Sequence, residues 1–282
     1  MPYVSDRMLE NLLQEDVPYI DLTTWALGIG EQRGCMEYFT REKIVLCGSE
    51  EAARIMQKLG IEVKESMPSG TVLAPGEVFL CAEGFVRDLH MAWKVCQNIL
   101  DHCSGIATAT RALLDEVRQV NPDISILTTR KSFPGTKPLV TKAVMVGGAV
   151  PHRLGLSETV LIFRQHMEFL GGVQGLIGAL PSIRKKLCEK KVIVEAETPE
   201  EGAAFCQAGA DGIQFDKLNV LELADAVKLL REMKPSAVIL AAGGIHAQNA
   251  CGFAKTGIDG IVTTSMFSAK PVDMGVKMSK SV

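Results

Sequence analysis

Short apolar runs rich in β-branched residues recur through the second half of this 282-residue chain, and they constrain its fold more than any other feature. Each run is followed by a turn or a helix-like stretch, and from the fourth onward the spacing is roughly 20–25 residues, the length of one strand-plus-helix unit. Nearly continuous apolar strands that alternate with helices predict a parallel sheet covered on its outer side. About seven such units suit a barrel or a near-complete barrel. The runs are ISILTT (124–129), KAVMVGG (142–148), TVLIFR (159–164), KVIVEAE (191–197), DGIQFD (211–216), AVILAAGG (237–244) and DGIVTTS (259–265).

The segments between these runs have the signals of helices. The segment TPEEGAAFCQAGA begins with Thr198 as a cap and Pro199 at the first helical position, and residues 219–233 have apolar side chains at helical spacing. An open doubly wound sheet is the alternative to a barrel. That fold usually has a glycine-rich first turn, and the sequence contains neither GxGxxG nor GxxxxGK[ST].

The first hundred residues have a different pattern, in which strands, turns and one helix at about 49–59 are mixed. This is α+β patterning, and it predicts a smaller, separate N-terminal domain. A long helix over roughly 86–119 is predicted to join it to the barrel, although a glycine weakens its middle. The expected domains are therefore 1–105 and 106–268, with the tail 269–282 packing back on the first.

Composition excludes several classes of function. The formal net charge is −3, so the protein has no general attraction to nucleic acid or to an anionic membrane, and any cationic function must be local. The N-terminus lacks the apolar region of a signal peptide, and no stretch reaches the roughly 18 apolar residues of a membrane span. We expect a soluble, cytoplasmic protein. Its eight cysteines form no CxxC pair and are expected to be reduced and mostly buried.

Cationic side chains follow the first two runs. In α/β barrels the active site forms where the strands end, and arginine and lysine at such positions bind carboxylate or phosphate oxygens. Arg130 and Lys131 follow Thr129, and His152 and Arg153 follow the second run. A solvated loop is the alternative for each pair, but two matching loops favour a binding function.

Carboxylates and small residues follow the later runs. Glu195 and Asp216 end the fourth and fifth runs, and two such carboxylates can hold Mg²⁺ partly through water. For both residues a structural ion pair is an equally open alternative. The last two runs end in small residues whose backbone N–H groups suit a phosphate: Gly243, Gly244, Thr264 and Ser265. Together these residues indicate an anionic acid, a metal and a phosphorylated co-substrate.

Several motifs occur in an order that resembles the quinolinate phosphoribosyltransferase family, the decarboxylating nicotinate-nucleotide pyrophosphorylases. The resemblance covers nearly the whole chain, and the TRK…PG and HRxGL motifs are its most specific part. The tail and the segments AWK and PHRLGLSET are most similar to the branch called molybdenum transport protein ModD. The motifs are EDVPYIDLTT (15–24), SGIAT (104–108), TTRKSFPGTK (128–137), GGAVPHRLGLSE (147–158), VEAET (194–198) and AAGGI (241–245).

The resemblance implies an N-terminal α/β sandwich-like domain and an incomplete, seven-stranded α/β barrel. It also implies a reaction and roles for the candidate residues. It implies dimers or higher homo-oligomers whose active site the neighbouring subunit completes, and transfer of phosphoribose from phosphoribosyl pyrophosphate to the ring nitrogen of an aromatic acid with Mg²⁺. By position, Glu195 and Asp216 would hold the Mg²⁺–pyrophosphate group, and Gly243, Gly244, Thr264 and nearby backbone would bind the 5′-phosphate. Substrate carboxylate and pyrophosphate would be bound by Arg130, Lys131, His152 and Arg153.

Three departures from the family pattern concern the acceptor. Trp93-Lys94 replaces Glu-Arg on the long helix, so that the charge is kept and the guanidinium fork is lost. Phe163 replaces a barrel-facing lysine, and Arg164 cannot substitute for it because adjacent strand residues point to opposite faces. Leu240 stands where the family has an acid. A pocket with less positive charge predicts an acceptor ring with fewer carboxylates than quinolinate.

Two alternatives to this function stay open. The protein could be a quinolinate phosphoribosyltransferase of NAD biosynthesis that tolerates the substitutions. It could also be a non-catalytic protein that binds molybdate or a related anion in the same group of cations. Retention of both carboxylates favours catalysis, because acidic side chains repel an oxyanion unless a metal intervenes.

Overall fold

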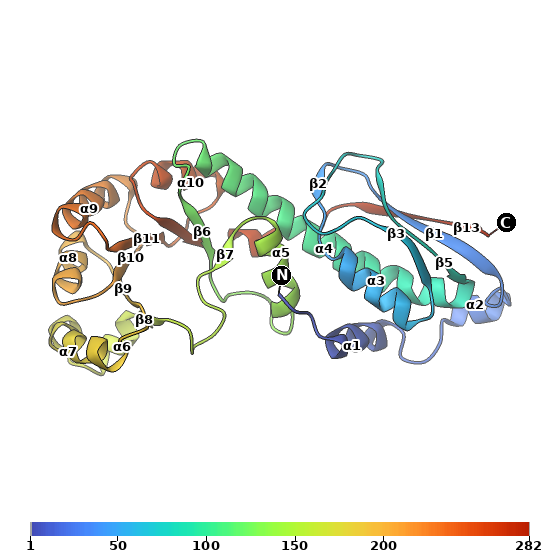
Figure 1. Cartoon of the computed structure of the whole chain (residues 1–282), viewed down its shortest axis with the longest axis horizontal. Coiled ribbons are helices and arrows are strands. Elements are labelled where there is room, and N and C mark those ends of the chain that lie inside the picture. The colour runs from blue at the N-terminus through green and yellow to red at the C-terminus, as the bar shows by residue number, and fades with distance from the viewer. Residues whose placement is uncertain (1, 282) are drawn as a thin grey trace. The chain divides into compact units, whose positions relative to one another are not determined.

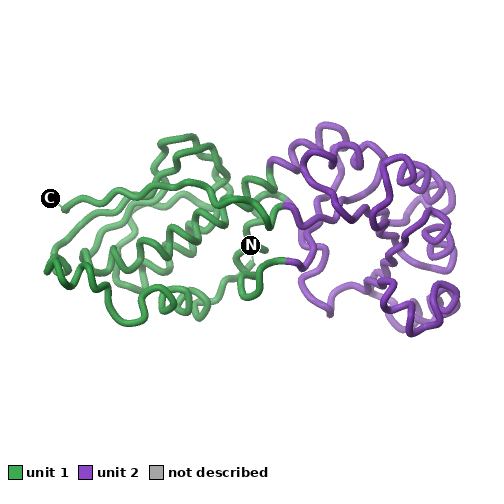
Figure 2. Tube along the Cα trace, turned by 180° about the vertical axis from the view of Figure 1, so that it is seen from behind, with its two compact units in different colours: residues 1–111, 132–148, 266–282 green, residues 112–131, 149–265 purple. Residues whose placement is uncertain are grey.

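A computed structural model describes residues 2–281 and divides the chain into two compact units, each described here by itself (Figure 2). Unit 1 is built from three stretches of chain, namely 2–111, 132–148 and 266–281. Unit 2 consists of 112–131 and 149–265. No helix among the described residues is both long enough and apolar enough to cross a membrane.

Unit 1 contains a four-stranded antiparallel sheet with the strand order β13-β1-β5-β3 (Figure 1). A second sheet has only β2 and β4. The tail of the chain thus pairs with the first strand. The strands are β1 (Arg33–Thr40), β2 (Ile44–Val45), β3 (Glu62–Ser66), β4 (Val72–Leu73), β5 (Val78–Phe85) and β13 (Met274–Lys280). The helices are α1 (Asp6–Asp16), α2 (Leu22–Leu27), α3 (Ser49–Lys58), α4 (Val86–Arg118) and α5 (Lys137–Val146), and residues 112–118 of α4 belong to unit 2.

The core of unit 1 follows from the alternation in its strands. Along β1 every second side chain is buried, so one face of the sheet packs inward. The largest of these side chains, Tyr38, is fully buried, and its hydroxyl donates to the carbonyl of Trp93 at 2.9 Å. The helices predicted at about 49–59 and 86–119 are confirmed as α3 and α4.

The run KAVMVGG, predicted as a strand, lies instead at the end of helix α5, so that prediction was wrong. Pro138 occupies the first turn of this helix, where its missing N–H costs nothing. The helix ends at Gly147, where a Cβ would come within 2.5 Å of Thr110 Cβ. The strand that follows is the short β7 (Val150–Pro151).

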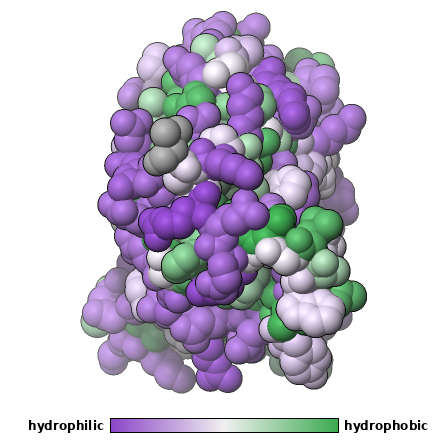
Figure 3. Space-filling view, turned by 90° about the vertical axis from the view of Figure 1, so that its right-hand side faces the viewer, coloured by the Kyte–Doolittle hydropathy of each residue, from purple (hydrophilic) through white to green (hydrophobic). Residues whose placement is uncertain are grey.

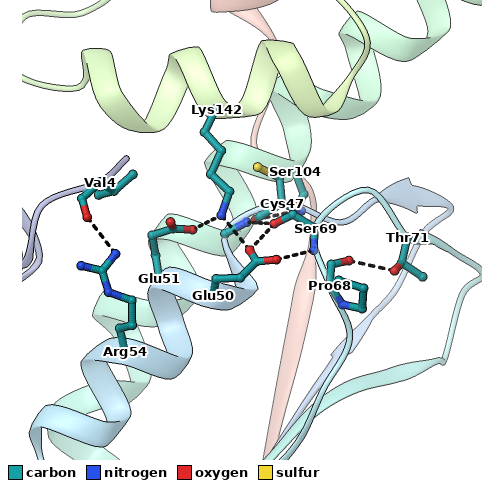
Figure 4. A network of polar contacts seen from close by, with 11 residues as sticks. Val4, Cys47, Glu50, Glu51, Arg54, Pro68, Ser69, Thr71, Ser104 and Lys142 are labelled. Atoms are coloured by element: carbon teal, nitrogen blue, oxygen red, sulfur yellow. Dashed lines mark hydrogen bonds and ion pairs between the residues drawn. The ribbon is translucent and has the colours of Figure 1, made fainter. Parts of the chain in front are cut away.

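A buried lysine joins α5 to the start of α3 within unit 1 (Figure 4). The Lys142 ammonium donates to Glu51 and, at 2.7 Å, to Glu50, which in turn accepts from the backbone and hydroxyl of Ser69. Lys142 and Glu51 are each 4% exposed. Burial opposes ionisation of Glu50, but these donors outweigh it and lower its pKa to about 2.

Exposed apolar side chains gather on and around α2 in unit 1. Figure 3 shows a hydrophobic area within a mainly hydrophilic face of this part of the molecule. The large apolar residues exposed there are Tyr19, Ile20, Leu22, Trp25 and Leu27.

Unit 2 is a seven-stranded parallel sheet with the order β7-β6-β12-β11-β10-β9-β8, and Figure 1 shows its helices on the outer side of the strands. The predicted incomplete barrel is confirmed, because β7 and β8 are the two edge strands of the described sheet and do not pair with each other. Its further strands are β6 (Ser125–Thr128), β8 (Val160–Ile162), β9 (Val192–Ala196), β10 (Gly212–Asp216), β11 (Val238–Ala242) and β12 (Gly260–Thr263). Its helices are α6 (Arg164–Glu168), α7 (Gly172–Lys186), α8 (Pro199–Gln207), α9 (Val220–Met233) and α10 (Ala247–Ala254); the 3₁₀ turn η1 (Ser265–Ser268) begins at its end.

Capping side chains fix where these helices begin, and apolar packing stabilises the sheet. Thr198 accepts a hydrogen bond from the backbone of Glu201 at 3.2 Å, and Asn219 caps α9 in the same way. On the concave face, apolar side chains from neighbouring strands form one cluster. Its members are Leu127, Val238, Leu240, Ala242 and Val262.

Candidate active site

The predicted site residues of unit 2 lie at the carboxyl edge of the barrel sheet. Because all seven strands are parallel, their carboxyl ends meet at one edge, where α/β barrels hold their active sites. Following the strand order, this edge carries Arg153 after β7, Arg130 after β6, Thr264 after β12, Gly243 after β11, Asp216 at the end of β10, Glu195 in β9 and Phe163 after β8.

The loop after β6 presents two exposed cations. The backbone N–H of Thr129 donates to the Thr263 carbonyl at 3.2 Å and continues the pairing of β6 with β12. The Thr129 hydroxyl accepts from the backbone of Lys131 at 3.2 Å, which bends the chain immediately after the strand. The side chains of Arg130 and Lys131 are exposed and make no hydrogen bond or ion pair with another described residue.

The loop after β7 presents a buried imidazole beside an arginine. The backbone of His152 donates to the Thr128 carbonyl at 2.9 Å, which extends the β6–β7 ladder. Both ring nitrogens of His152 are buried without a partner among the described residues. Burial, reinforced by the charge of Arg153, lowers the pKa of His152, so its ring is neutral at pH 7 and can accept or donate a hydrogen bond.

Arg153, which follows one edge strand of the sheet, lies near Phe163, which follows the other edge strand. Its guanidinium lies 5.9 Å from the centroid of the Phe163 ring, although β7 and β8 are at opposite ends of the strand order. Burial and, secondarily, the charge of Arg130 lower the pKa of Arg153, so the two guanidinium groups are close enough to repel each other. Such crowding of like charges is stabilised when an anion binds between them.

The two carboxylates lie on β9 and β10, which β12 and β11 separate from the cation-bearing strands β6 and β7 in the sheet. Burial first, and the neighbouring Asp216 second, raise the pKa of Glu195. Gln214, which is 4% exposed, opposes this by donating its amide Nε2 to Glu195 Oε2 at 2.9 Å. Gln214 is not among the residues predicted from the sequence, although a polar residue within an apolar strand run is a usable signal. Its Oε1 is buried without a partner among the described residues.

The glycine pair after β11 has a backbone that other residues rarely adopt. Gly243 and Gly244 have φ values of 92° and 69°. After β12, the hydroxyl of Thr263 donates to the Ile245 carbonyl at 2.6 Å and accepts from the backbone of Ser265 at 3.1 Å. This contact joins the two loops that were predicted to hold a phosphate.

Residues 21–104 match the model "Quinolinate phosphoribosyl transferase, N-terminal domain", and residues 106–277 match the corresponding C-terminal domain. The chain belongs to the quinolinate phosphoribosyl transferase family. The resemblance recognised in the motifs is therefore confirmed.

Two relatives and one solved structure illustrate its place in this family. ModD of Rhodobacter capsulatus, named a pyrophosphorylase, is 40% identical over 254 residues, covering 90% of this chain and 97% of the relative. A probable nicotinate-nucleotide pyrophosphorylase of Methanothermobacter thermautotrophicus is 30% identical over 278 residues, covering 96% and 98%. The crystal structure of NadC from Streptococcus pyogenes has a TM-score of 0.91 at 26% identity and full coverage of both chains.

Lys94, the remaining predicted site residue, belongs to unit 1. Its ammonium lies 4.6 Å from the centre of the Trp93 ring and donates to Gln97 at 3.1 Å. It lines a pocket of unit 1 beside Asp21 and His90. Its role in this member of the quinolinate phosphoribosyl transferase family stays a prediction.

Glu195 and Asp216 are the candidate donors for the predicted Mg²⁺. Among residues 2–281 no group of three or more His, Cys, Asp or Glu side chains is arranged to hold a metal. After burial, the charge of Asp216 is the second cause that raises the pKa of Glu195, so the two carboxylates lie near each other and form a pair of oxygen donors. Mg²⁺ is commonly bound through one or two carboxylates, water and substrate phosphates, so this pair fits a substrate-bridged Mg²⁺ in a family member.

Proposed function

We propose that the protein transfers phosphoribose from phosphoribosyl pyrophosphate to the ring nitrogen of an aromatic, pyridine-type carboxylic acid. The observation that carries the proposal is the arrangement of one sheet edge: cations follow β6 and β7, carboxylates end β9 and β10, and a glycine pair follows β11. These are the groups needed for an acid, a leaving pyrophosphate and a 5′-phosphate. A homodimer or higher homo-oligomer is part of the proposal.

Each residue has a role that follows from its chemistry. Arg130 and Arg153 bind the acceptor carboxylate and orient the ring nitrogen toward the ribosyl carbon. Lys131 stabilises the negative charge that develops on the departing pyrophosphate. His152, whose lowered pKa keeps it neutral, offers a hydrogen bond without adding charge.

Glu195 and Asp216 would hold Mg²⁺, which when bound neutralises pyrophosphate charge. Gln214 keeps the Glu195 carboxylate in place through its hydrogen bond at 2.9 Å. Gly243, Gly244 and the backbone near Thr264 and Ser265 receive the 5′-phosphate. No covalent nucleophile is needed, because the reaction displaces pyrophosphate directly by the acceptor nitrogen.

Phe163 supports the proposal that the acceptor carries fewer carboxylates than quinolinate. A buried carboxylate must be paired, and a phenyl ring offers no partner where a lysine would. The ring instead lies near the guanidinium of Arg153, a contact worth about 0.5–1 kcal/mol at an exposed site.

Binding and turnover test the reaction separately. Calorimetry with phosphoribosyl pyrophosphate plus Mg²⁺ should show saturable binding, and molybdate should show none. A panel of pyridine, pyrimidine and benzene carboxylic acids is then screened for pyrophosphate release. Binding of molybdate without binding of phosphoribosyl pyrophosphate would replace the proposal with an anion-binding function.

The acceptor is tested with Phe163→Lys. This variant should raise the affinity for quinolinate at least tenfold, because one new charge-assisted hydrogen bond is worth roughly 1.5–3 kcal/mol. Phe163→Leu is the control that removes the ring without adding charge. Wild-type turnover of quinolinate comparable with that of a quinolinate enzyme would refute the changed acceptor.

A further inference from the structure

Lys217 has a backbone conformation that no other non-glycine residue among residues 2–281 adopts. Its φ is 62°, in the left-handed region, where the Cβ of an ordinary residue is crowded. Glycine occupies this region freely, and asparagine adopts it more easily than lysine does. Backbone strain of this kind persists where the surrounding structure imposes it, and it gathers at functional sites.

The conformation directs the lysine across the glycine pair. The backbone N–H of Lys217 donates to the Ala242 carbonyl at 2.9 Å, so the residue is fixed to the end of β11. A Cβ placed on Gly243 would come within 2.5 Å of Lys217 Cγ and 2.8 Å of its backbone nitrogen. The stem of Lys217 therefore lies directly against Gly243, and any larger residue at 243 would displace it.

The charged end of the same side chain lies beside the carboxylates. Lys217 Nζ is 3.5 Å from Asp216 Oδ2, and its charge also acts on Glu195. The side chain is 79% exposed and has no other ion pair among the described residues, so the ammonium can reach a ligand. It stands between the carboxylates of β9 and β10 on one side and the glycine pair on the other.

We infer that Lys217 is a phosphate-binding residue of this site, whose ammonium contacts the phosphate oxygens of phosphoribosyl pyrophosphate. The inference rests on the proposed function and deepens it by adding a cation that none of the strand-end motifs includes. A compact ammonium with three donors suits a polyphosphate, which presents oxygens in several directions. Lys217 also supplies a positive charge on the side of the edge where the carboxylates would otherwise repel the ligand.

A purely structural role predicts a different outcome on substitution. If Lys217 only terminates β10, then asparagine should serve better at this φ and leave ligand binding unchanged. If Lys217 binds phosphate, then asparagine should keep or improve the fold and weaken binding. Lys217→Asn therefore separates the two roles without risking the fold.

The experiment measures the dissociation constant for phosphoribosyl pyrophosphate with Mg²⁺ by calorimetry, using the full chain. We expect Lys217→Asn to raise it about tenfold, the loss of one charge-assisted hydrogen bond, and to leave the thermal midpoint unchanged or higher. Lys217→Arg keeps the charge and should bind within about threefold of wild type. Lys255→Asn is the matched control, because Lys255 is an exposed lysine at the end of α10 with an ordinary φ of −67°.

Failure of the inference and failure of the proposed function give different results. Wild type and Lys217→Asn binding phosphoribosyl pyrophosphate equally well would overturn the role of Lys217 and leave the proposed function standing. Wild type that fails to bind phosphoribosyl pyrophosphate would overturn both. Equal weakening by Lys217→Asn and Lys255→Asn would reduce the effect to general electrostatics and also overturn the specific contact.

Discussion

At the scale of single residues, Arg130 and Phe163 represent opposite kinds of contribution to the carboxyl edge of the barrel. Arg130 is exposed, makes no ion pair among the described residues, and repels Arg153. No described residue neutralises its positive charge, so the Arg130 guanidinium is available to bind an anion. Phe163 contributes shape and a contact with Arg153.

The first prediction compares these two residues. We expect Arg130→Ala to weaken acceptor binding by tenfold or more, because a bidentate guanidinium–carboxylate contact is lost. Phe163→Ala should weaken it by only a few fold. Equilibrium titration of each variant with the acceptor found in the screen measures both. Equal acceptor affinity in wild type and Arg130→Ala would contradict the assignment.

The second prediction concerns Asp101 on α4, in unit 1. Burial, with Asp273 nearby, raises the pKa of Asp101 to about 6 despite a hydrogen bond from the Met274 backbone. Its Oδ1 is buried without a partner among the described residues. Between the unfolded value of 3.8 and about 6 the native state holds the proton more tightly, so the native state loses stability as pH rises through this window.

Asp101→Asn should therefore raise the free energy of unfolding at pH 7.5 by about 1–2 kcal/mol. The gain should shrink as pH falls below about 6 and disappear at about pH 3, where the wild-type carboxyl is mostly protonated in both states. Urea unfolding at several pH values measures the difference in free energy of unfolding between Asp101→Asn and wild type. Asp115→Asn, an exposed position on the same helix, is the control, and an equal gain there would indicate a net-charge effect instead.

Most candidate site residues on unit 2 are visible in the sequence, because active sites of α/β barrels form where the apolar strand runs end. Arg130, Glu195 and Asp216 all follow or end such runs. Lys217 could not be found in this way, because its significance lies in a positive φ that the sequence does not reveal for a lysine. Gln214 is intermediate, since its polarity is visible and its hydrogen bond to Glu195 is not.

At the scale of elements, α5 shows where apolar periodicity stops being informative. KAVMVGG is apolar and β-branched enough for a strand, but it is the last turns of a helix that begins at Lys137, beside Pro138. A short apolar run cannot distinguish a buried strand from a buried helix segment. The decisive partners are Glu50 and Glu51, about ninety residues earlier in the chain, and no local pattern identifies them.

The third prediction tests that link. Lys142→Met should lower the free energy of unfolding by roughly 3 kcal/mol, because it leaves the Glu51 carboxylate buried without its partner. The double variant Lys142→Met/Glu51→Leu should recover most of the loss. Guanidinium unfolding measures all three proteins. A single variant as stable as wild type would show that α5 is held by apolar packing alone.

The same network has an acid-side signature. Because Glu50 has a folded-state pKa of about 2 and an unfolded-state pKa of 4.5, its stabilising contribution is present above pH 4.5 and is lost as pH falls toward 2. Lys142→Met should flatten this part of the pH–stability curve.

At the scale of the whole molecule, unit 1 is assembled from stretches that the barrel residues separate in sequence. β13 pairs with β1 along seven residue pairs from Gly34–Lys280 to Thr40–Met274. Gln97 Nε2 also donates to the Met274 carbonyl at 2.7 Å. The seven-stranded barrel was predictable from repetition, whereas this pairing is supported by no periodicity in the sequence.

The fourth prediction is that a chain ending at Pro271 is destabilised by about 3–5 kcal/mol. It loses two buried apolar side chains, Val272 and Met274, at roughly 1.5–3 kcal/mol each. It also leaves β1 as an unpaired edge, so aggregation should increase. Light scattering and thermal unfolding measure both effects. A control chain ending at Lys280 keeps β13 and should behave as wild type.

The pairing of β13 with β1 has a consequence for synthesis on the ribosome. The neighbour of β1 is translated more than 230 residues later, after every strand of unit 2. Until then the nascent chain exposes an open hydrogen-bonding edge, while the barrel strands are already available to one another. Every strand of unit 2 is therefore available during translation, whereas the sheet of unit 1 is completed only after its distant strand has been made.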